Sequence, residues 1–225
     1  MGLGQYAKDT SPTEVGALKL YDHPETQRIL RMLVQAPYSR GLKLPVGLEW
    51  IWPALSMAER FQRDEVGVLH PHTYITVRRG PVVTKTDDVW HVDGFSTRYA
   101  HLPEANYIMV SGSMGTEYLD QTFEFPEHFD PLKHDIQKYF QNEAAPWGST
   151  RGMKLDTLYF LDPYVIHRRP PSSRGAQRTF VRISFTPIEI PDINNTPNPL
   201  LPTAHYVLDG IKEFRDGLRD YHEEL

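Results

Sequence analysis

The chain has 225 residues, a formal net charge of -5 and no cysteine. This length suits a single domain with a substantial core. The negative charge disfavours non-specific electrostatic binding to nucleic acid or to an anionic membrane. The absence of cysteine excludes disulfides, zinc sites built from thiolates and cysteine nucleophiles.

The sequence has no feature that predicts a membrane or a secreted location. No apolar run approaches the roughly 20 residues of a membrane-spanning helix. Residues 1–16, MGLGQYAKDTSPTEVG, lack the apolar core of a signal peptide. We therefore expect a cytoplasmic protein that does not contact a membrane.

Residues 1–70 are predicted to form a helical N-terminal region. In PETQRILRMLVQ, which starts at Pro24, apolar residues recur at helical spacing, and a proline near the start is typical of a first helical turn. A second helix is predicted within PALSMAERFQRDE, residues 53–65.

Residues 71–187 are predicted to form the β-rich core. Short segments rich in β-branched and aromatic residues are separated there by Gly, Pro, Asp and Ser, which is typical of strands and turns. These segments are HTYITVRR, PVVTKT, DVWHVD, NYIMVSG, TEYLD, DTLYFLD and QRTFVRISF. The stretch between TEYLD and DTLYFLD interrupts the series and is predicted to hold a short helix around residues 131–140.

Residues 188–225 are predicted to form a proline-rich segment and a C-terminal helix, because apolar residues recur at helical spacing after residue 205. The chain as a whole, residues 1–225, is therefore predicted to be one domain. Its fold class is mainly β with flanking helices, around a double-stranded β-helix core of the jelly-roll, cupin-like type.

The segment DVWHVD suggests a metal site. In a strand, residues i and i+2 project to the same face, so His91 and Asp93 point one way and Trp90 and Val92 the other. Two histidines and one carboxylate on a single face are the arrangement associated with non-haem iron(II). The pair alone is a weak signal, since the chain also contains His-x-Asp at residues 128–130, which we interpret as part of a turn.

A third ligand and a basic strand strengthen this interpretation. His167 follows the strand and turn of DTLYFLDPYVI, although a lone histidine in such a place is more often a surface residue. RTFVRISF then puts Arg178, Arg182 and Ser184 on one face, opposite an apolar stripe. If the polar face points outward, the arginines are solvated; if it points into a barrel, each needs an anionic partner.

Together, His91-x-Asp93, His167 and Arg178 resemble the iron(II)- and 2-oxoglutarate-dependent oxygenases, whose pattern is His-x-Asp/Glu, a distal histidine and then a basic residue. VWHVDG, GSMGTEYLD and DTLYFLDPYVIHR also look like the corresponding segments of that family. The resemblance covers about residues 71–187, and the flanking regions are not diagnostic.

The resemblance implies a role for each matching residue. His91, Asp93 and His167 would hold Fe(II) as the catalytic centre. Arg178 would pair with the distal carboxylate of the cosubstrate 2-oxoglutarate in a charge-assisted contact, and O2 would complete the chemistry.

Three further residues are predicted to contact the cosubstrate: Arg182, Ser184 and Tyr107. For Arg182, an acidic substrate is an alternative partner. Tyr107 lies on a strand next to the first motif, where residues either line the pocket or pack in the core.

The resemblance implies an oxygenase that hydroxylates, oxidatively demethylates or desaturates a small polar or anionic metabolite. One alternative is a nucleobase- or nucleic-acid-modifying dioxygenase of the same superfamily. Another is a noncatalytic or cosubstrate-independent cupin-like metal protein. Arg168, Arg169 and Arg174 form a basic cluster that suits an anionic substrate, a nucleic-acid backbone or plain solvation.

Overall fold

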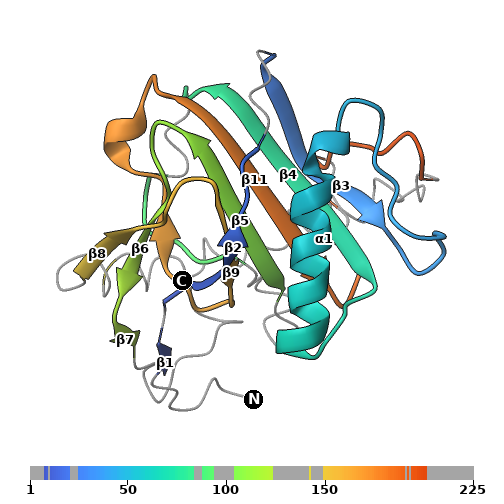
Figure 1. The fold of residues 1–225 in the computed structure, drawn as a ribbon, viewed down its shortest axis with the longest axis horizontal. Coiled ribbons are helices and arrows are strands. Elements are labelled where there is room, and N and C mark those ends of the chain that lie inside the picture. The colour runs from blue at the N-terminus through green and yellow to red at the C-terminus, as the bar shows by residue number, and fades with distance from the viewer. Residues whose placement is uncertain are drawn as a thin grey trace, which may run out of the picture.

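The computed structural model describes residues 8–9, 11–20, 25–83, 88–93, 104–123, 142, 149–190, 192 and 194–201. The helices predicted around residues 131–140 and after residue 205 lie outside these ranges. The described part of the chain is mainly β, with one α-helix, one six-stranded sheet and one three-stranded sheet (Figure 1). The predicted mainly β class is therefore confirmed.

The six-stranded sheet is antiparallel throughout, in the order β2-β9-β5-β11-β4-β3 (Figure 1). Its strands are β2 (Thr13–Ala17), β3 (Gln27–Gln35), β4 (His72–Pro81), β5 (Ala105–Gly112), β9 (Thr157–Leu161) and β11 (Gln177–Thr186). The long central strand β11 pairs with β4 on one side and β5 on the other, so it joins the two halves of the sheet.

The smaller sheet is also antiparallel, in the order β10-β6-β8. Its strands are β6 (Glu117–Asp120), β8 (Ser149–Gly152) and β10 (His167–Arg168). A separate short pairing joins β1 (Lys8–Asp9) to β7 (Thr122–Phe123).

Most of the predicted strands are present at or near their predicted positions. HTYITVRR, NYIMVSG, TEYLD, DTLYFLD and QRTFVRISF correspond to β4, β5, β6, β9 and β11. Of PVVTKT, only the first residue belongs to a strand, and residues 84–86 lie outside the described ranges. DVWHVD forms a single isolated β-bridge instead of a strand.

The helix predicted from Pro24 is wrong, because Gln27–Gln35 forms the edge strand β3. A β-bulge causes the error. Arg31 has a positive φ of 43°, and the register shifts between Ile29 and Met32. The bulge puts Ile29 and Met32, three residues apart, into the same core, so the apolar spacing imitates that of a helix. The region 1–70 thus contains two strands of the large sheet as well as a helix.

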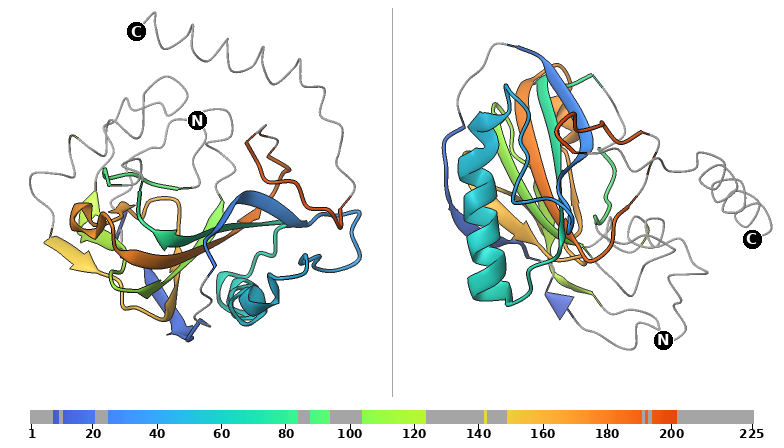
Figure 2. Two further views of the ribbon diagram at one scale, coloured as in Figure 1. Left: turned by 90° about the horizontal axis from the view of Figure 1, so that it is seen from above. Right: turned by 90° about the vertical axis from the view of Figure 1, so that its right-hand side faces the viewer.

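The second predicted helix is confirmed as α1 (Trp52–Phe61), which a 3-10 turn precedes and a π-helical turn, Gln62–Val66, extends. Ala54, Leu55 and Ala58 are its buried residues, and α1 lies against one face of the large sheet (Figure 2). Gly67 adopts a left-handed φ of 76° directly after the last turn, a conformation that favours glycine. Within the described part of the chain, no helix combines the length and apolar character needed to cross a membrane.

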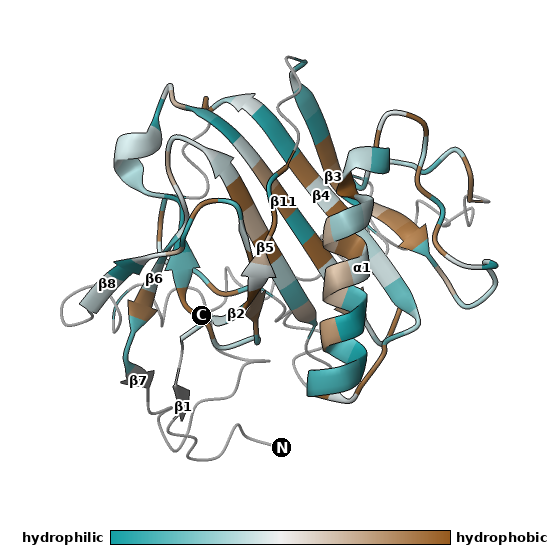
Figure 3. Ribbon diagram, viewed as in Figure 1, coloured by the Kyte–Doolittle hydropathy of each residue, from teal (hydrophilic) through white to brown (hydrophobic). Residues whose placement is uncertain are grey.

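The strands of the large sheet alternate between apolar and polar residues, which is visible in Figure 3 on β4 and β11. On β11, Val181, Ile183 and Phe185 are buried in the core beneath α1. Residues Arg178, Phe180 and Arg182 face the other side of the sheet.

A second apolar cluster covers part of that other face, on the side of β5 and β9. Ile108, Val110 and Tyr159 from these strands pack with Met153 and Val165 from the segments that flank the smaller sheet. The half of the face formed by β11, β4 and β3 is lined instead by polar residues around a cavity.

Gly112 supplies a test of how closely β5 packs against β11. Its φ is 111°, and a Cβ added there would lie 2.6 Å from the carbonyl oxygen of Gln177. We expect Gly112→Ala to lower the free energy of unfolding by more than about 1 kcal/mol, because both the backbone conformation and the space exclude a side chain. Chemical denaturation measures this difference.

The matched control is Gly152→Ala, since a Cβ at Gly152 meets no atom within 4 Å. That substitution should change the free energy of unfolding by less than about 0.5 kcal/mol. Equal effects of the two substitutions would contradict the packing described for Gly112.

Candidate metal centre

The backbone places two histidines directly opposite each other. The His91 N–H donates to the His167 carbonyl oxygen at 3.0 Å, and the His167 N–H donates to the His91 carbonyl oxygen at 2.9 Å. His167 belongs to β10, which ties His91 to the smaller sheet. Trp90 and Val92, on either side of His91, are buried, as the predicted alternation requires.

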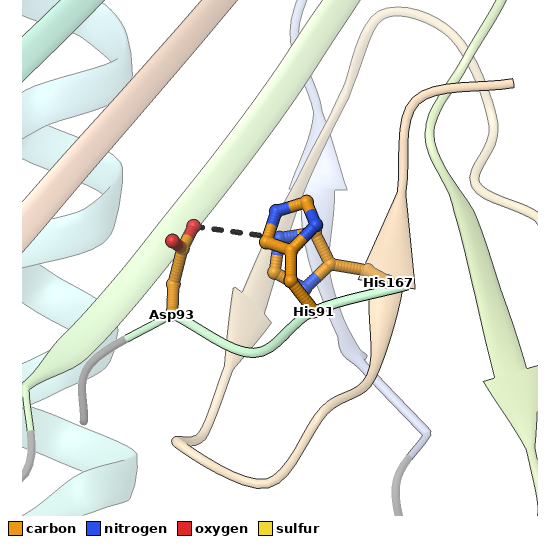
Figure 4. Close-up of side chains that lie close together, drawn as sticks. All are labelled: His91, Asp93 and His167. Atoms are coloured by element: carbon orange, nitrogen blue, oxygen red, sulfur yellow. Dashed lines mark ion pairs between the residues drawn. The ribbon is translucent and has the colours of Figure 1, made fainter. Parts of the chain in front are cut away.

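Three side chains converge at this bridge. One ligand atom from each of His91, Asp93 and His167 lies within 4.8 Å of the others (Figure 4). The His167 Nε2 is 3.4 Å from Asp93 Oδ2, and the two imidazole rings have their centroids 4.5 Å apart. The structure thus brings together the three residues that the sequence analysis predicted as ligands, in a group that can hold a metal ion.

The hydrogen bonds of both imidazoles orient them for metal binding. His91 Nδ1 lies 2.8 Å from the Val89 carbonyl oxygen, and His167 Nδ1 lies 3.0 Å from the Val165 carbonyl oxygen. A carbonyl oxygen only accepts, so each Nδ1 carries the proton and each Nε2 keeps its lone pair. Metal-binding histidines commonly have this second hydrogen bond, which fixes the ring and the tautomer.

The protonation states suit a divalent cation. Burial lowers the pKa of His91 to about 4, and the neighbouring His167 adds to this effect, so the His91 imidazole is neutral at pH 7. Burial alone would raise the pKa of Asp93, but Arg182 and His167 outweigh it and hold this pKa well below its usual value. The Asp93 carboxylate is therefore ionised.

Arg182 holds the Asp93 carboxylate in place. Its Nη1 lies 2.5 Å from Asp93 Oδ2, and both side chains are largely buried. Burial lowers the pKa of Arg182, but the carboxylate raises it by more, so the guanidinium stays charged. Arg182 also lines the cavity, as predicted for a cosubstrate contact, but its charge is already matched by the candidate metal ligand Asp93.

A cavity of about 520 Å³ opens beside the three candidate ligands, and all three line it. This volume is in the usual range for small-molecule sites. Among the described lining residues, Asp93 is the only acid, whereas arginine is frequent. The lining arginines are Arg28, Arg78, Arg79, Arg168, Arg169, Arg178 and Arg182.

Arg178 is a buried cation that lines this cavity. Its residue is 8% exposed, its Nη2 donates to Thr116 Oγ1 at 2.9 Å, and its Nε has no hydrogen-bond partner. No carboxylate among the described residues forms an ion pair with it. Burial lowers the pKa of Arg178 to about 10, with contributions from Arg169 and Arg78. The group is still charged at pH 7, so it needs an anion.

Two other residues predicted to contact the cosubstrate, Tyr107 and Ser184, lie away from the cavity. Tyr107 is paired in register with Ile183, so its side chain lies in the core on the α1 side of the sheet, where its hydroxyl donates to Gln62 Oε1 at 2.7 Å. Ser184 is buried, and its hydroxyl donates to Asn106 Oδ1 at 2.5 Å. Neither residue lines the cavity.

Arg28 and Thr116 line the cavity but could not be predicted there from the sequence. Arg28 was assigned to a helix, and only the strand β3 reveals that it shares a face with Arg78. Thr116 lies just before β6, and no pattern in the sequence marked it. Of the basic cluster after His167, Arg168 and Arg169 line the cavity, and Arg174 is exposed outside it.

No protein-family model matches the chain, and no curated protein is significantly similar to it in sequence. The geometry of the cavity and of the His91–Asp93–His167 group therefore carries the functional interpretation.

We expect the protein to bind one Fe(II) ion per chain through the His91–Asp93–His167 group. His91→Ala should weaken binding by more than about 100-fold, because even the residues that support a metal ligand typically contribute 10- to 100-fold. Anaerobic isothermal titration calorimetry with Fe(II) measures the affinity and the stoichiometry.

His70→Ala is the control, since His70 lies outside the three-residue group and the cavity. It should bind Fe(II) like the wild type. Undiminished Fe(II) binding by His91→Ala would exclude this group as the metal site.

Proposed function

We propose that the protein is an iron(II)- and 2-oxoglutarate-dependent oxygenase that hydroxylates, oxidatively demethylates or desaturates a small anionic metabolite. The observation that carries this proposal is the buried Arg178 guanidinium in the same cavity as His91, Asp93 and His167. A candidate metal site thus shares one cavity with a cation that has no carboxylate partner among the described residues.

The donor set fits Fe(II). Two imidazole nitrogens and one carboxylate oxygen leave coordination positions open, whereas a structural zinc site normally uses four protein ligands. The open positions suit a cosubstrate that chelates the metal through a 2-oxo acid group. With Fe(II), 2-oxoglutarate and O2 bound, the centre would supply the oxidation of a substrate C–H bond.

The residues of the chain would position these groups. Arg178, supported by the Thr116 hydroxyl, would bind the distal carboxylate of 2-oxoglutarate through its guanidinium. Arg182 would keep Asp93 in its orientation, and the carbonyl oxygens of Val89 and Val165 would do the same for the histidines.

The arrangement of the sheets supports a double-stranded β-helix core. Arg178 belongs to the large antiparallel sheet, and His167 belongs to the smaller one, yet both line the cavity. Jelly-roll proteins have two antiparallel sheets that face each other in this way.

A cupin-like metal protein that needs no cosubstrate is the rival proposal. It would use the same three ligands but would give Arg178 no anion to bind. The buried guanidinium therefore favours the cosubstrate-dependent reaction.

Arg178→Gln tests the cosubstrate site. We expect it to weaken 2-oxoglutarate binding to the Mn(II)-loaded protein by about 10- to 100-fold, because hydrogen bonds to a charged group contribute about 1.5–3 kcal/mol. Calorimetry measures the affinity, and succinate formation with Fe(II) and ascorbate measures the turnover that accompanies it.

Arg174→Gln is the matched control, because Arg174 is exposed and does not line the cavity. It should leave both measurements unchanged. If Arg178→Gln binds 2-oxoglutarate as tightly as the wild type, the cosubstrate does not use this arginine, and the cosubstrate-independent rival gains support.

A further inference from the structure

Two exposed valines line the same cavity as the candidate metal ligands. Val89 is 46% exposed and Val83 is 69% exposed, and both belong to the cavity wall. Single apolar side chains scattered over a protein surface need no explanation. These two valines come from different segments of the chain but border one cavity, so a molecule that occupies the cavity meets apolar surface there.

Val89 lies on the same side of its segment as the metal ligands. Val89, His91 and Asp93 line the cavity, whereas the alternate residues Trp90 and Val92 are buried. This is the two-residue period of an extended chain. The Val89 carbonyl oxygen lies 2.8 Å from His91 Nδ1, and this hydrogen bond fixes the backbone here. The apolar side chain of Val89 is therefore held at the cavity, two residues from a candidate metal ligand.

Val83 reaches the cavity from the segment that follows β4. The backbone of the preceding residue is held on both sides: the Val82 N–H donates to the Ala176 carbonyl oxygen at 3.0 Å, and the Gly175 N–H donates to the Val82 carbonyl oxygen at 2.9 Å. Pro81, Val82 and Val83 all line the cavity. These hydrogen bonds keep a short apolar run at the cavity wall.

Phe180 adds apolar surface from the large sheet. It lines the cavity from β11 and packs against the second apolar cluster, which includes Ile108 and Val110. The cavity therefore combines apolar side chains with the arginines described above. Ligand pockets commonly have apolar walls with a few polar groups that orient the ligand.

We propose that Val83 and Val89 bind a hydrocarbon chain of the substrate, so that the substrate is an amphiphilic anion, a carboxylate that carries an apolar chain. This inference rests on the proposed function, in which the substrate is a small anionic metabolite. Contact between the chain and the two valines would remove apolar surface from water, which stabilises the complex.

The position of Val89 links this binding mode to the proposed reaction. Val89 and His91 line one cavity from the same short segment. A hydrocarbon chain that contacts Val89 would therefore bring C–H bonds close to the candidate metal centre. The proposed oxidation requires a C–H bond in that place.

Straight-chain monocarboxylates are the probes for the two valines. The protein is loaded with Mn(II) and saturated with 2-oxoglutarate. Butanoate, hexanoate and octanoate are then titrated, and the paramagnetic relaxation of their terminal methyl protons is measured by NMR. We expect the affinity to rise about 2- to 4-fold for each added methylene group, because burying one such group contributes a factor of this size. The methyl protons should relax faster in the complex, since the chain would share the cavity with the metal.

Val89→Ser and Val83→Ser test the two side chains separately. Each replaces apolar surface by a hydroxyl, so each should weaken octanoate binding by at least about 3-fold and lower the gain per methylene group. Val83→Ser carries the test if Val89→Ser disturbs His91. Val68→Ser is the matched control, because Val68 is 50% exposed and does not line the cavity. It should bind all three carboxylates like the wild type.

Four results would overturn the proposal. The first is an affinity of the wild type that does not rise with chain length. The second is the same gain per methylene group in the wild type and in both cavity variants, which would put the chain elsewhere. The third is displacement of 2-oxoglutarate by octanoate, which would put octanoate in the cosubstrate site. The fourth is equally tight binding of 1-octanol, which would show that the ligand need not be an anion.

The proposed function can fail separately. If 2-oxoglutarate does not bind, the carboxylates are titrated calorimetrically without it, and the dependence on Val83 and Val89 still decides whether the two valines bind a hydrocarbon chain. If 2-oxoglutarate binds but chain length has no effect, the inferred substrate class is wrong and the oxygenase proposal stands.

Discussion

The strict alternation of side chains along β11 is the constraint on which both the core and the cavity depend. Because successive residues of a strand point to opposite faces, Val181, Ile183 and Phe185 enter the core beneath α1 while Arg178 and Arg182 face the cavity. β11 is paired along its length with β4 and β5, so a side chain cannot change to the other face without breaking the sheet. The packing of the core thus keeps the guanidinium groups of Arg178 and Arg182 buried, an environment that charged groups otherwise avoid.

Charge balance in the cavity follows from this constraint. Asp93 neutralises Arg182, and Glu117 pairs with Arg168 at 2.8 Å, but the described residues that line the cavity contain no further acid. Arg178 is buried and has no carboxylate partner among the described residues. Anions that bind the folded protein here would stabilise it, because ligands that bind only the native state add their binding free energy to its stability. In the proposed function, the distal carboxylate of 2-oxoglutarate would balance the charge of Arg178.

Two of the three candidate metal ligands could be predicted from the sequence, because their placement follows a local rule. His91 and Asp93 share a face by the two-residue period, and this holds even though residues 88–93 form only one bridge. The same period puts Arg178 on the polar face of β11, but its predicted role came from the family resemblance. The convergence of His167 with the pair came only from the family resemblance, since no local pattern specifies which distant histidine lies opposite His91.

The errors arose where geometry departs from regular periods or depends on register. The bulge at Arg31 gave β3 the apolar spacing of a helix. The position of Arg28 beside the cavity could therefore not be predicted. The strand that contains Tyr107 was predicted correctly, but the face to which Tyr107 points was not. Its side chain faces the core because Tyr107 lies opposite Ile183, and this register is a long-range property. A polar residue such as Thr116, which lies next to Arg178 only in the fold, has no signature in the sequence.

The most direct test of the central claim is anomalous diffraction at the iron absorption edge, from crystals grown without oxygen in the presence of Fe(II) and 2-oxoglutarate. We predict a single iron peak within bonding distance of Nε2 of His91, Nε2 of His167 and an oxygen of Asp93, with the distal carboxylate of 2-oxoglutarate on the Arg178 guanidinium. Iron bound elsewhere, or a carboxylate that does not contact Arg178, would contradict the account.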